Sequence, residues 1–166
     1  MDPVVLPFWD IVRSRQVPVL GRRRLHHLTR SPYEAAELIP APLSHVLSAS
    51  IVWCGNRPIM ILSTVDTRLN FDRFAEWFGY SIRPATPIEV SVLAGTHVQG
   101  STPAGLAWMM PVFIDAVLMQ EDALWLSAGD PSIWICLAPP DLQQVTGAFA
   151  VDIRLDTEGM RPARGF

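Results

Sequence analysis

The chain has 166 residues, of which 49% are apolar and 17% are charged, and this composition excludes an intrinsically disordered protein. Its length predicts one domain with a core of its own, and no apolar run approaches the roughly 18 residues that a membrane-spanning helix needs. The two cysteines, Cys54 and Cys136, exclude a disulfide scaffold and a CxxC zinc or redox motif.

Positive charge is concentrated at the start of the chain. Residues 1–30 carry a net charge of +4 and residues 31–166 a net charge of −7, which gives the total of −3. All 13 basic residues are arginines, so chemistry that needs a lysine ammonium is not available to this chain. The basic cluster of the first segment consists of Arg22, Arg23, Arg24, His26, His27 and Arg30. It indicates either a solvated surface or a phosphate-binding patch for nucleic acid.

Prolines and glycines divide the chain into short predicted elements. Capping boxes stand at residues 31–34 and 86–89, and Asn70 caps a further helix that Gly79 ends. In chain order we expect a helix over 8–16, a strand over 25–28, a helix over 32–38, strands over 48–54 and 58–64, helices over 71–78 and 87–95, strands over 112–114, 123–127 and 133–137, a helix over 139–145 and a strand over 148–153.

The mixed order of these elements decides the predicted fold class. The strands over 48–54 and 58–64 form a hairpin, and the aromatic side chains of the 71–78 helix are expected in the core: Phe71, Phe74, Trp77 and Phe78. We therefore expect an α/β (mixed α+β) fold, a curved barrel-like mixed β-sheet flanked by helices.

Most familiar catalytic motifs are absent from the sequence. There is no GxSxG nucleophile elbow, no phosphate-binding loop and no metal-ligand spacing, so we expect no metal and no cofactor. No base accompanies Cys54 in the sequence, and a small core residue at a strand end fits that cysteine better than a nucleophile does.

The distinctive part of the sequence is a loop with glycines and proline at Gly95, Gly100, Pro103 and Gly105. Such a loop exposes backbone amides, which bind carbonyl, carboxylate or phosphate oxygens without a charged side chain. Further along, small residues at 127–129 end a predicted strand and leave room for a ligand. An ordinary connector rich in turn residues is the alternative reading of the loop.

The glycine loop, then Pro111, Ile114 and Asp115, then Ser127 and Gly129 resemble the YbaK/prolyl-tRNA-synthetase-associated domain family of aminoacyl-tRNA editing deacylases. Shorter matches lie at residues 33–36, 70–75 and 141–142. The resemblance implies a single editing domain over residues 1–166, with its core at about 8–153, and the same curved, barrel-like sheet.

The resemblance implies an enzyme that hydrolyses the ester between a wrong amino acid and the 3′ end of a tRNA, often proline tRNA. With no room for a synthetase core, the chain would act in trans. Water can attack an ester polarised by backbone N–H groups, so no protein nucleophile is needed. The implied catalytic residues are Gly100, Ser101, Pro103 and Gly105, and the implied substrate-binding residues are Ala49, Ser50, His97, Ser127, Ala128 and Gly129. From the basic cluster, the expected nucleic-acid-binding residues are Arg22, Arg23, Arg24 and Arg30.

The sequence departs from the family at the pocket lysine. Ala49 stands at that position, or Ser48 or Ser50 if the alignment slips by one residue. In the loop, the second glycine of the family's pair is replaced by Gln99 or Ser101, and the family's aromatic residue by Thr96.

Two functions therefore remain open. The first is a deacylase in which an arginine, such as Arg57 or Arg68, takes over the role of the lysine. The second is a catalytically degenerate module that binds tRNA, a nucleotide or a protein.

The expected partners are the 3′ acceptor end of an aminoacyl-tRNA and a synthetase, with no membrane partner, and the chain would be a monomer or a homodimer. The first residues, MDPVVLPFW, lack the basic segment and long apolar core of a signal peptide. The sequence thus predicts a cytoplasmic protein.

Overall fold

The computed structural model describes residues 8–26, 29, 31–94, 110–130 and 132–154. In chain order the elements are α1 (Phe8–Ser14), β1 (Gly21–Arg24), α2 (Pro32–Glu37), the 3₁₀ helix η1 (Leu43–His45), β2 (Leu47–Cys54), β3 (Arg57–Thr64), α3 (Phe71–Phe78), β4 (Ile82–Pro84), α4 (Pro87–Ala94), β5 (Val112–Asp115), the 3₁₀ helix η3 (Ala116–Gln120), β6 (Leu124–Ser127), β7 (Ile133–Leu137), α5 (Pro139–Thr146) and β8 (Phe149–Val151).

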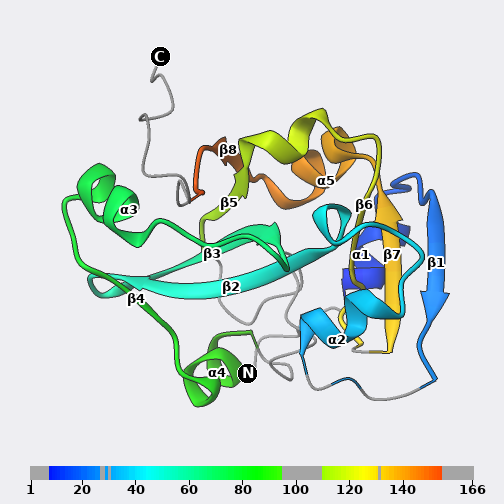
Figure 1. The fold of residues 1–166 in the computed structure, drawn as a ribbon, viewed down its shortest axis with the longest axis horizontal. Helices are drawn as coiled ribbons and strands as arrows, with labels where there is room; N and C mark the ends of the chain where they lie inside the picture. Colours follow the sequence, from blue (N-terminus) through cyan, green and yellow to red (C-terminus); the bar gives the residue numbers. More distant parts are fainter. Residues whose placement is uncertain (1–7, 27–28, 30, 95–109, 131, 155–166) are drawn as a thin grey trace.

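The strands form two sheets (Figure 1). One sheet has the order β1-β7-β6 and the other β4-β2-β3-β5-β8. The pairings of β3 with β5 and of β5 with β8 are parallel, and the other pairings within the sheets are antiparallel. A parallel bridge between Val46 and Trp125 joins the start of β2 to β6. The predicted mixed sheet flanked by helices is confirmed.

The helices begin where their capping residues predict. The Ser31 hydroxyl accepts the N–H of Glu34 at 3.1 Å, and the Asn70 side chain accepts the N–H of Arg73 at 3.0 Å. Thr86 and Glu89 bond each other's backbone N–H groups at 2.8 and 3.3 Å, which is a complete capping box. Within the described ranges, no helix is long and apolar enough to cross a membrane.

The long hairpin of β2 and β3 separates two parts of the core. Leu47 and Ile51 belong to a large cluster with α1, β6 and β7, whereas Val52 and Cys54 belong to a second cluster with α3. Because successive side chains of a strand point to opposite faces, one hairpin serves both clusters. Of the aromatic residues of α3 that were expected in the core, Phe74 is fully buried. Trp77 is 49% exposed, so the core position expected for it is wrong.

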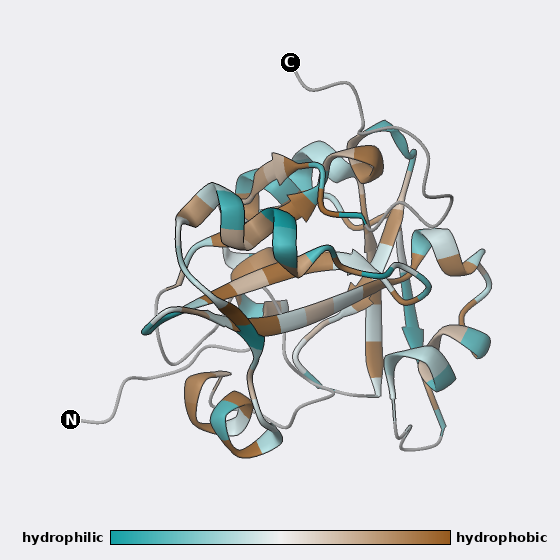
Figure 2. Cartoon of the chain, turned by 60° about the vertical axis from the view of Figure 1, so that its left-hand side comes forward, coloured by the Kyte–Doolittle hydropathy of each residue, from teal (hydrophilic) through white to brown (hydrophobic). Residues whose placement is uncertain are grey.

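One strand lies where the sequence did not predict it. The expected strand over 25–28 is wrong: the strand is β1, four residues earlier, and Leu25 and His26 follow it, while residues 27 and 28 lie outside the described ranges. β1 is polar along its length (Figure 2), so it has no apolar alternation, and its pairing with β7 makes it a strand. The short strand β4 was also not predicted.

Candidate functional site

Two strands from different sheets start side by side and carry two of the predicted site segments. β2 and β6 leave the bridge between Val46 and Trp125 in the same direction, because the bridge is parallel. Ala49 and Ala128 each follow the bridge by three residues, one on each chain segment. Both alanines belong to one part of the core, since Ala128 is a buried member of the large cluster and Ala49 packs against that cluster, although 79 positions separate them in the sequence.

The side chain of Ala49 faces the same part of the core as Ala128. Ala49 packs against the cluster that contains Leu126 and Ala128. Ser50, the next residue, alternates to the other face, which Val52 shares with the second cluster. Of the three residues that the alignment offers for the family lysine, Ala49 is thus the one on the face of β2 that packs against the cluster of Ala128, while Ser48 and Ser50 lie on the opposite face.

The turn after β6, residues 127–130, is held rigidly by its own hydrogen bonds, and we call it the 127–130 corner. The Ser127 hydroxyl donates to the carbonyl of Asp130 and accepts the N–H of Gly129, both at 3.3 Å. The N–H of Ala128 donates to Ile133 at 2.9 Å. Gly129 has φ of 103°, which favours glycine. Ser127, only 6% exposed, therefore shapes the corner through its hydroxyl.

Helix α1 closes the corner from a direction that sequence reasoning missed. The N–H of Trp9 donates to the carbonyl of Ala128 at 3.0 Å, and Phe8 is fully buried beside it in the same cluster. No motif in the sequence marks Trp9, because its contact is made by the backbone. The contact between Trp9 and Ala128 forms only when α1 packs on the sheet, so it has no signal in the sequence.

The carboxylate of Asp130 carries the negative charge of the corner. It accepts the hydroxyl and the N–H of Ser132 at 2.7 and 2.8 Å. These two bonds lower the pKa of Asp130, and the charge of Arg24 lowers it further. Asp130 is thus anionic at neutral pH and fixed toward Ser132.

The predicted glycine loop falls on residues that the structure does not describe. His97, Gly100, Ser101, Pro103 and Gly105 all lie outside the described ranges. The residues on either side of the 95–109 segment, Ala94 and Met110, both pack against the cluster of Ala49 and Ala128. Ala94 and Met110 thus belong to the same part of the core as the two alanines.

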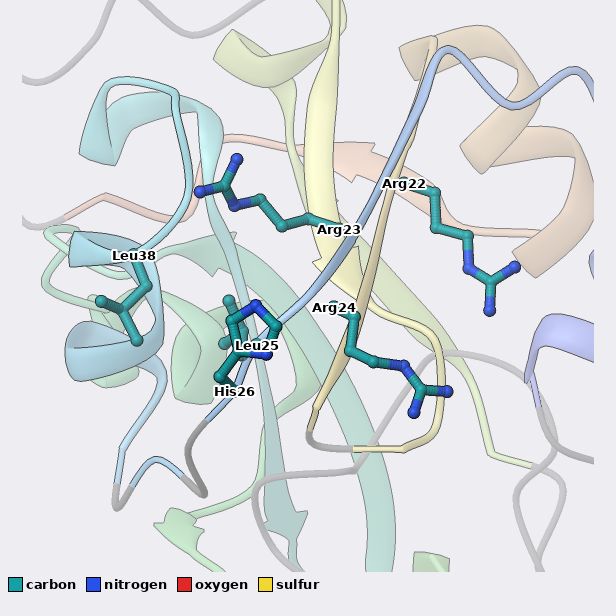
Figure 3. A pocket seen from close by; sticks show the side chains of 6 residues that line it. All are labelled: Arg22, Arg23, Arg24, Leu25, His26 and Leu38. Carbon is teal, nitrogen blue, oxygen red and sulfur yellow. The ribbon is translucent and has the colours of Figure 1, made fainter.

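The predicted basic residues occupy β1, whose side chains are exposed (Figure 3). Arg22, Arg23 and Arg24 line an open hollow of about 450 Å³ together with Leu25, His26 and Leu38. Arg30 lies outside the described residues. The arginines expected to replace the family lysine are elsewhere: Arg57 pairs with Cys54, about 17 Å along β2 from Ala49, and Arg68 is exposed beyond the end of β3.

Other candidate groups have structural roles or ordinary reactivity. Asp115, fully buried, accepts the N–H of Val117 and pairs with Arg154, so it holds the last described residues against β5. Burial raises the pKa of the Cys54 and Cys136 thiols, which makes both poor nucleophiles at neutral pH. In the part of the chain that the structure describes, no three His, Cys, Asp or Glu side chains form a group that could hold a metal ion.

Comparison of the sequence with known proteins finds one family model and one bacterial relative. The model of the aminoacyl-tRNA editing domain family matches residues 26–145. The uncharacterized protein YwhH of Bacillus subtilis is 29% identical over 112 residues, which is 67% of this chain and 71% of that protein.

Two solved structures share the fold. A structure described as a "putative trans-editing enzyme for prolyl tRNA synthetase" superposes with a TM-score of 0.79 at 23% identity, over 93% of this chain and 99% of that one. A scaffold protein used for computational epitope grafting gives a TM-score of 0.81 at 21% identity, with the same coverage. The family model spans both β2, which carries Ala49, and β6, which leads into Ala128. The chain belongs to the aminoacyl-tRNA editing domain family.

Proposed function

We propose that this chain is a trans-acting deacylase that hydrolyses the ester of a mischarged tRNA, with proline tRNA as the first candidate. The observation that carries the proposal is that Ala49 and Ala128 pack in one cluster of the core, on chain segments that the bridge between Val46 and Trp125 joins. Ala94 and Met110, at the two ends of the 95–109 segment, pack in that same cluster. One domain over residues 1–166, with its core at about 8–153, contains the whole of this arrangement.

The proposed chemistry needs no protein nucleophile. Water adds to the ester carbonyl, the bond from the acyl carbon to the ribose oxygen breaks, and that oxygen takes a proton, which yields a free amino acid and tRNA. Gly100, Ser101, Pro103 and Gly105 would surround the ester, where backbone N–H groups stabilise the developing oxyanion. His97 would contact the aminoacyl-adenosine end. No metal and no cofactor enter this scheme.

The described wall of the site would select substrates by size. Ala49 and Ala128 bear single methyl groups, and Gly129 has no side chain. The hydrogen bonds of the 127–130 corner fix its backbone, so the wall cannot retreat from a larger amino acid without breaking them. A small, rigid pocket accepts a small wrong amino acid and excludes a larger correct one.

The test uses the two faces of β2. Ala49→Lys restores the ammonium of the family on the face of Ala128, and Ser50→Lys adds the same charge on the opposite face. Assayed on a panel of mischarged tRNAs, Ala49→Lys should raise deacylation by about tenfold or more, equal to about 1.4 kcal/mol, and Ser50→Lys should not. Circular dichroism shows whether each variant folds.

The outcomes separate the two candidate functions. Strong wild-type hydrolysis with no gain from Ala49→Lys would support the deacylase and show that another group replaces the lysine. No hydrolysis by either protein across the panel would reject the deacylase. A binding module for tRNA, a nucleotide or a protein is the second candidate, which the uncharged Ala49 favours.

A further inference from the structure

We propose that one face of β1 is the RNA-backbone contact of this protein, in which Arg22 and Arg24, but not Arg23, bind phosphates of the tRNA. This inference rests on the proposed function for its partner, a tRNA whose 3′ end reaches the 127–130 corner. It assigns the roles of the three arginines from the register of the strand, which the sequence alone does not give.

The register of β1 on β7 divides the three arginines between two faces. Arg22 stands opposite Ile135 and Arg24 opposite Ile133, whereas Arg23 stands opposite Trp134. Directly opposed residues of paired strands share a face. Ile133 and Ile135 pack in the cluster that includes α1, and Trp134 packs in the cluster of α2. In Figure 3, Arg22 and Arg24 accordingly point to one side of the strand and Arg23 to the other.

Both residues of the first face are connected to the proposed substrate wall. The guanidinium of Arg22 lies over the ring of Trp9, 5.0 Å from its centre, and the N–H of Trp9 is bonded to Ala128. Arg24 acts electrostatically on Asp130, which follows Gly129. Two cations are thus connected to the corner at which the aminoacyl end would sit, and among the described residues no ion pair or ring contact joins Arg23 to this corner.

The charges of this face are available to a ligand. Arg22, Arg23 and Arg24 are all exposed, and none of them forms an ion pair with a carboxylate in the described part of the chain. The ring of Trp9 fixes the position of Arg22 without neutralising it. Arg22 and Arg24 are two strand positions, or about 6.6 Å, apart, so each can serve a different phosphate.

A polyanion fits this face better than a single anionic group does. The segment 1–30 has a charge of +4 in a chain whose remainder has −7, so the attraction is local to β1 and is not a property of the whole surface. The competing explanation is that the arginines protect an edge strand from pairing with other chains. If the arginines only protected the edge strand, all three would contribute equally and none would be needed for RNA binding.

The experiment measures the binding of an uncharged acceptor-stem RNA hairpin by fluorescence anisotropy at several salt concentrations. Arg22→Ala with Arg24→Ala is compared with Arg23→Ala, and with Arg57→Ala as an exposed arginine at the start of β3. The double variant should weaken binding about tenfold or more and lower the salt slope by about two, since each lost phosphate contact lowers it by about one. The other two variants should change binding less than threefold.

Equal losses in Arg23→Ala and Arg57→Ala, or an unchanged salt slope in the double variant, would overturn the proposal. A lysine version, Arg22→Lys with Arg24→Lys, keeps the charge and should recover most of the binding, which excludes a folding defect as the cause. This binding assay requires no catalysis, so it tests β1 even if the chain proves not to be a deacylase.

A second measurement connects the face to the reaction. If the proposed function holds, the double alanine variant should hydrolyse a 3′-aminoacyl adenosine, which has no RNA backbone, at the wild-type rate. It should lose about tenfold on the full aminoacyl-tRNA. A loss on the small ester as large as that on the tRNA would contradict the assignment of Arg22 and Arg24 to the RNA backbone.

Discussion

The 127–130 corner and the strand β1 lie near each other and are built in opposite ways. The corner is neutral but for Asp130, and its backbone and side chains are engaged in hydrogen bonds with one another, with Trp9 and with the start of β7. β1 is cationic and exposed, and none of its arginines forms an ion pair with a carboxylate among the described residues. An ester must be held in one geometry, whereas a polyanion can be held by charge alone, so the two regions suit two parts of one substrate.

The largest effect is expected where the geometry of the corner depends on a glycine. Gly129→Ala forces a side chain into a backbone with φ of 103°, which should lower the free energy of unfolding by about 1–3 kcal/mol and reduce deacylation at least about tenfold. Gly79→Ala is the matched control, because Gly79 has φ of 69° at the end of α3 with no atom near its added Cβ. Urea unfolding and the deacylation assay are run on both variants.

The control should lose stability and keep activity. Equal losses of activity in the two glycine variants would mean that deacylation follows global stability and not the shape of the corner.

A smaller effect should depend on pH. Because hydrogen bonds from Ser132 lower the pKa of Asp130 in the folded chain, the ionised carboxylate stabilises the fold above its unfolded pKa, near 4, and this contribution is lost as the pH falls through the folded pKa. Asp130→Asn should therefore have a lower Tm than the wild type at pH 7, and the difference should shrink below about pH 4. A difference in Tm that is constant from pH 7 to pH 3 would show that the charge of Asp130 contributes nothing.

The smallest effect on stability is expected in β1. Removing both Arg22 and Arg24 should change the free energy of unfolding by less than about 0.5 kcal/mol per residue, because both side chains are exposed and form no ion pair with a described carboxylate. Urea unfolding measures this directly. A decrease of about 2 kcal/mol or more in the free energy of unfolding would show that the arginines stabilise the fold as the corner does. The two regions would then no longer differ in this respect.

The local elements of the fold were predictable because their signals lie within a few residues of one another. Ser31, Asn70 and the pair of Thr86 and Glu89 cap helices through contacts three residues apart, and Gly79 ends α3 in a left-handed conformation. The hairpin of β2 and β3 followed from alternation around a short turn. The order of the glycine, proline and aspartate motifs also identified the family, since that pattern is a property of the sequence.

The tertiary structure alone decided how these pieces meet. The strand β1 has no apolar alternation, so only its pairing with β7 defines it and divides Arg22 and Arg24 from Arg23. The separation of Ala49 from Ser50 follows from which face of β2 meets β6, and the bridge between Val46 and Trp125 joins segments 79 positions apart. The sequence by itself determined the local elements and the family, because those signals are short in range; the site and the basic face depend on strand register, which is fixed by burial across the whole core.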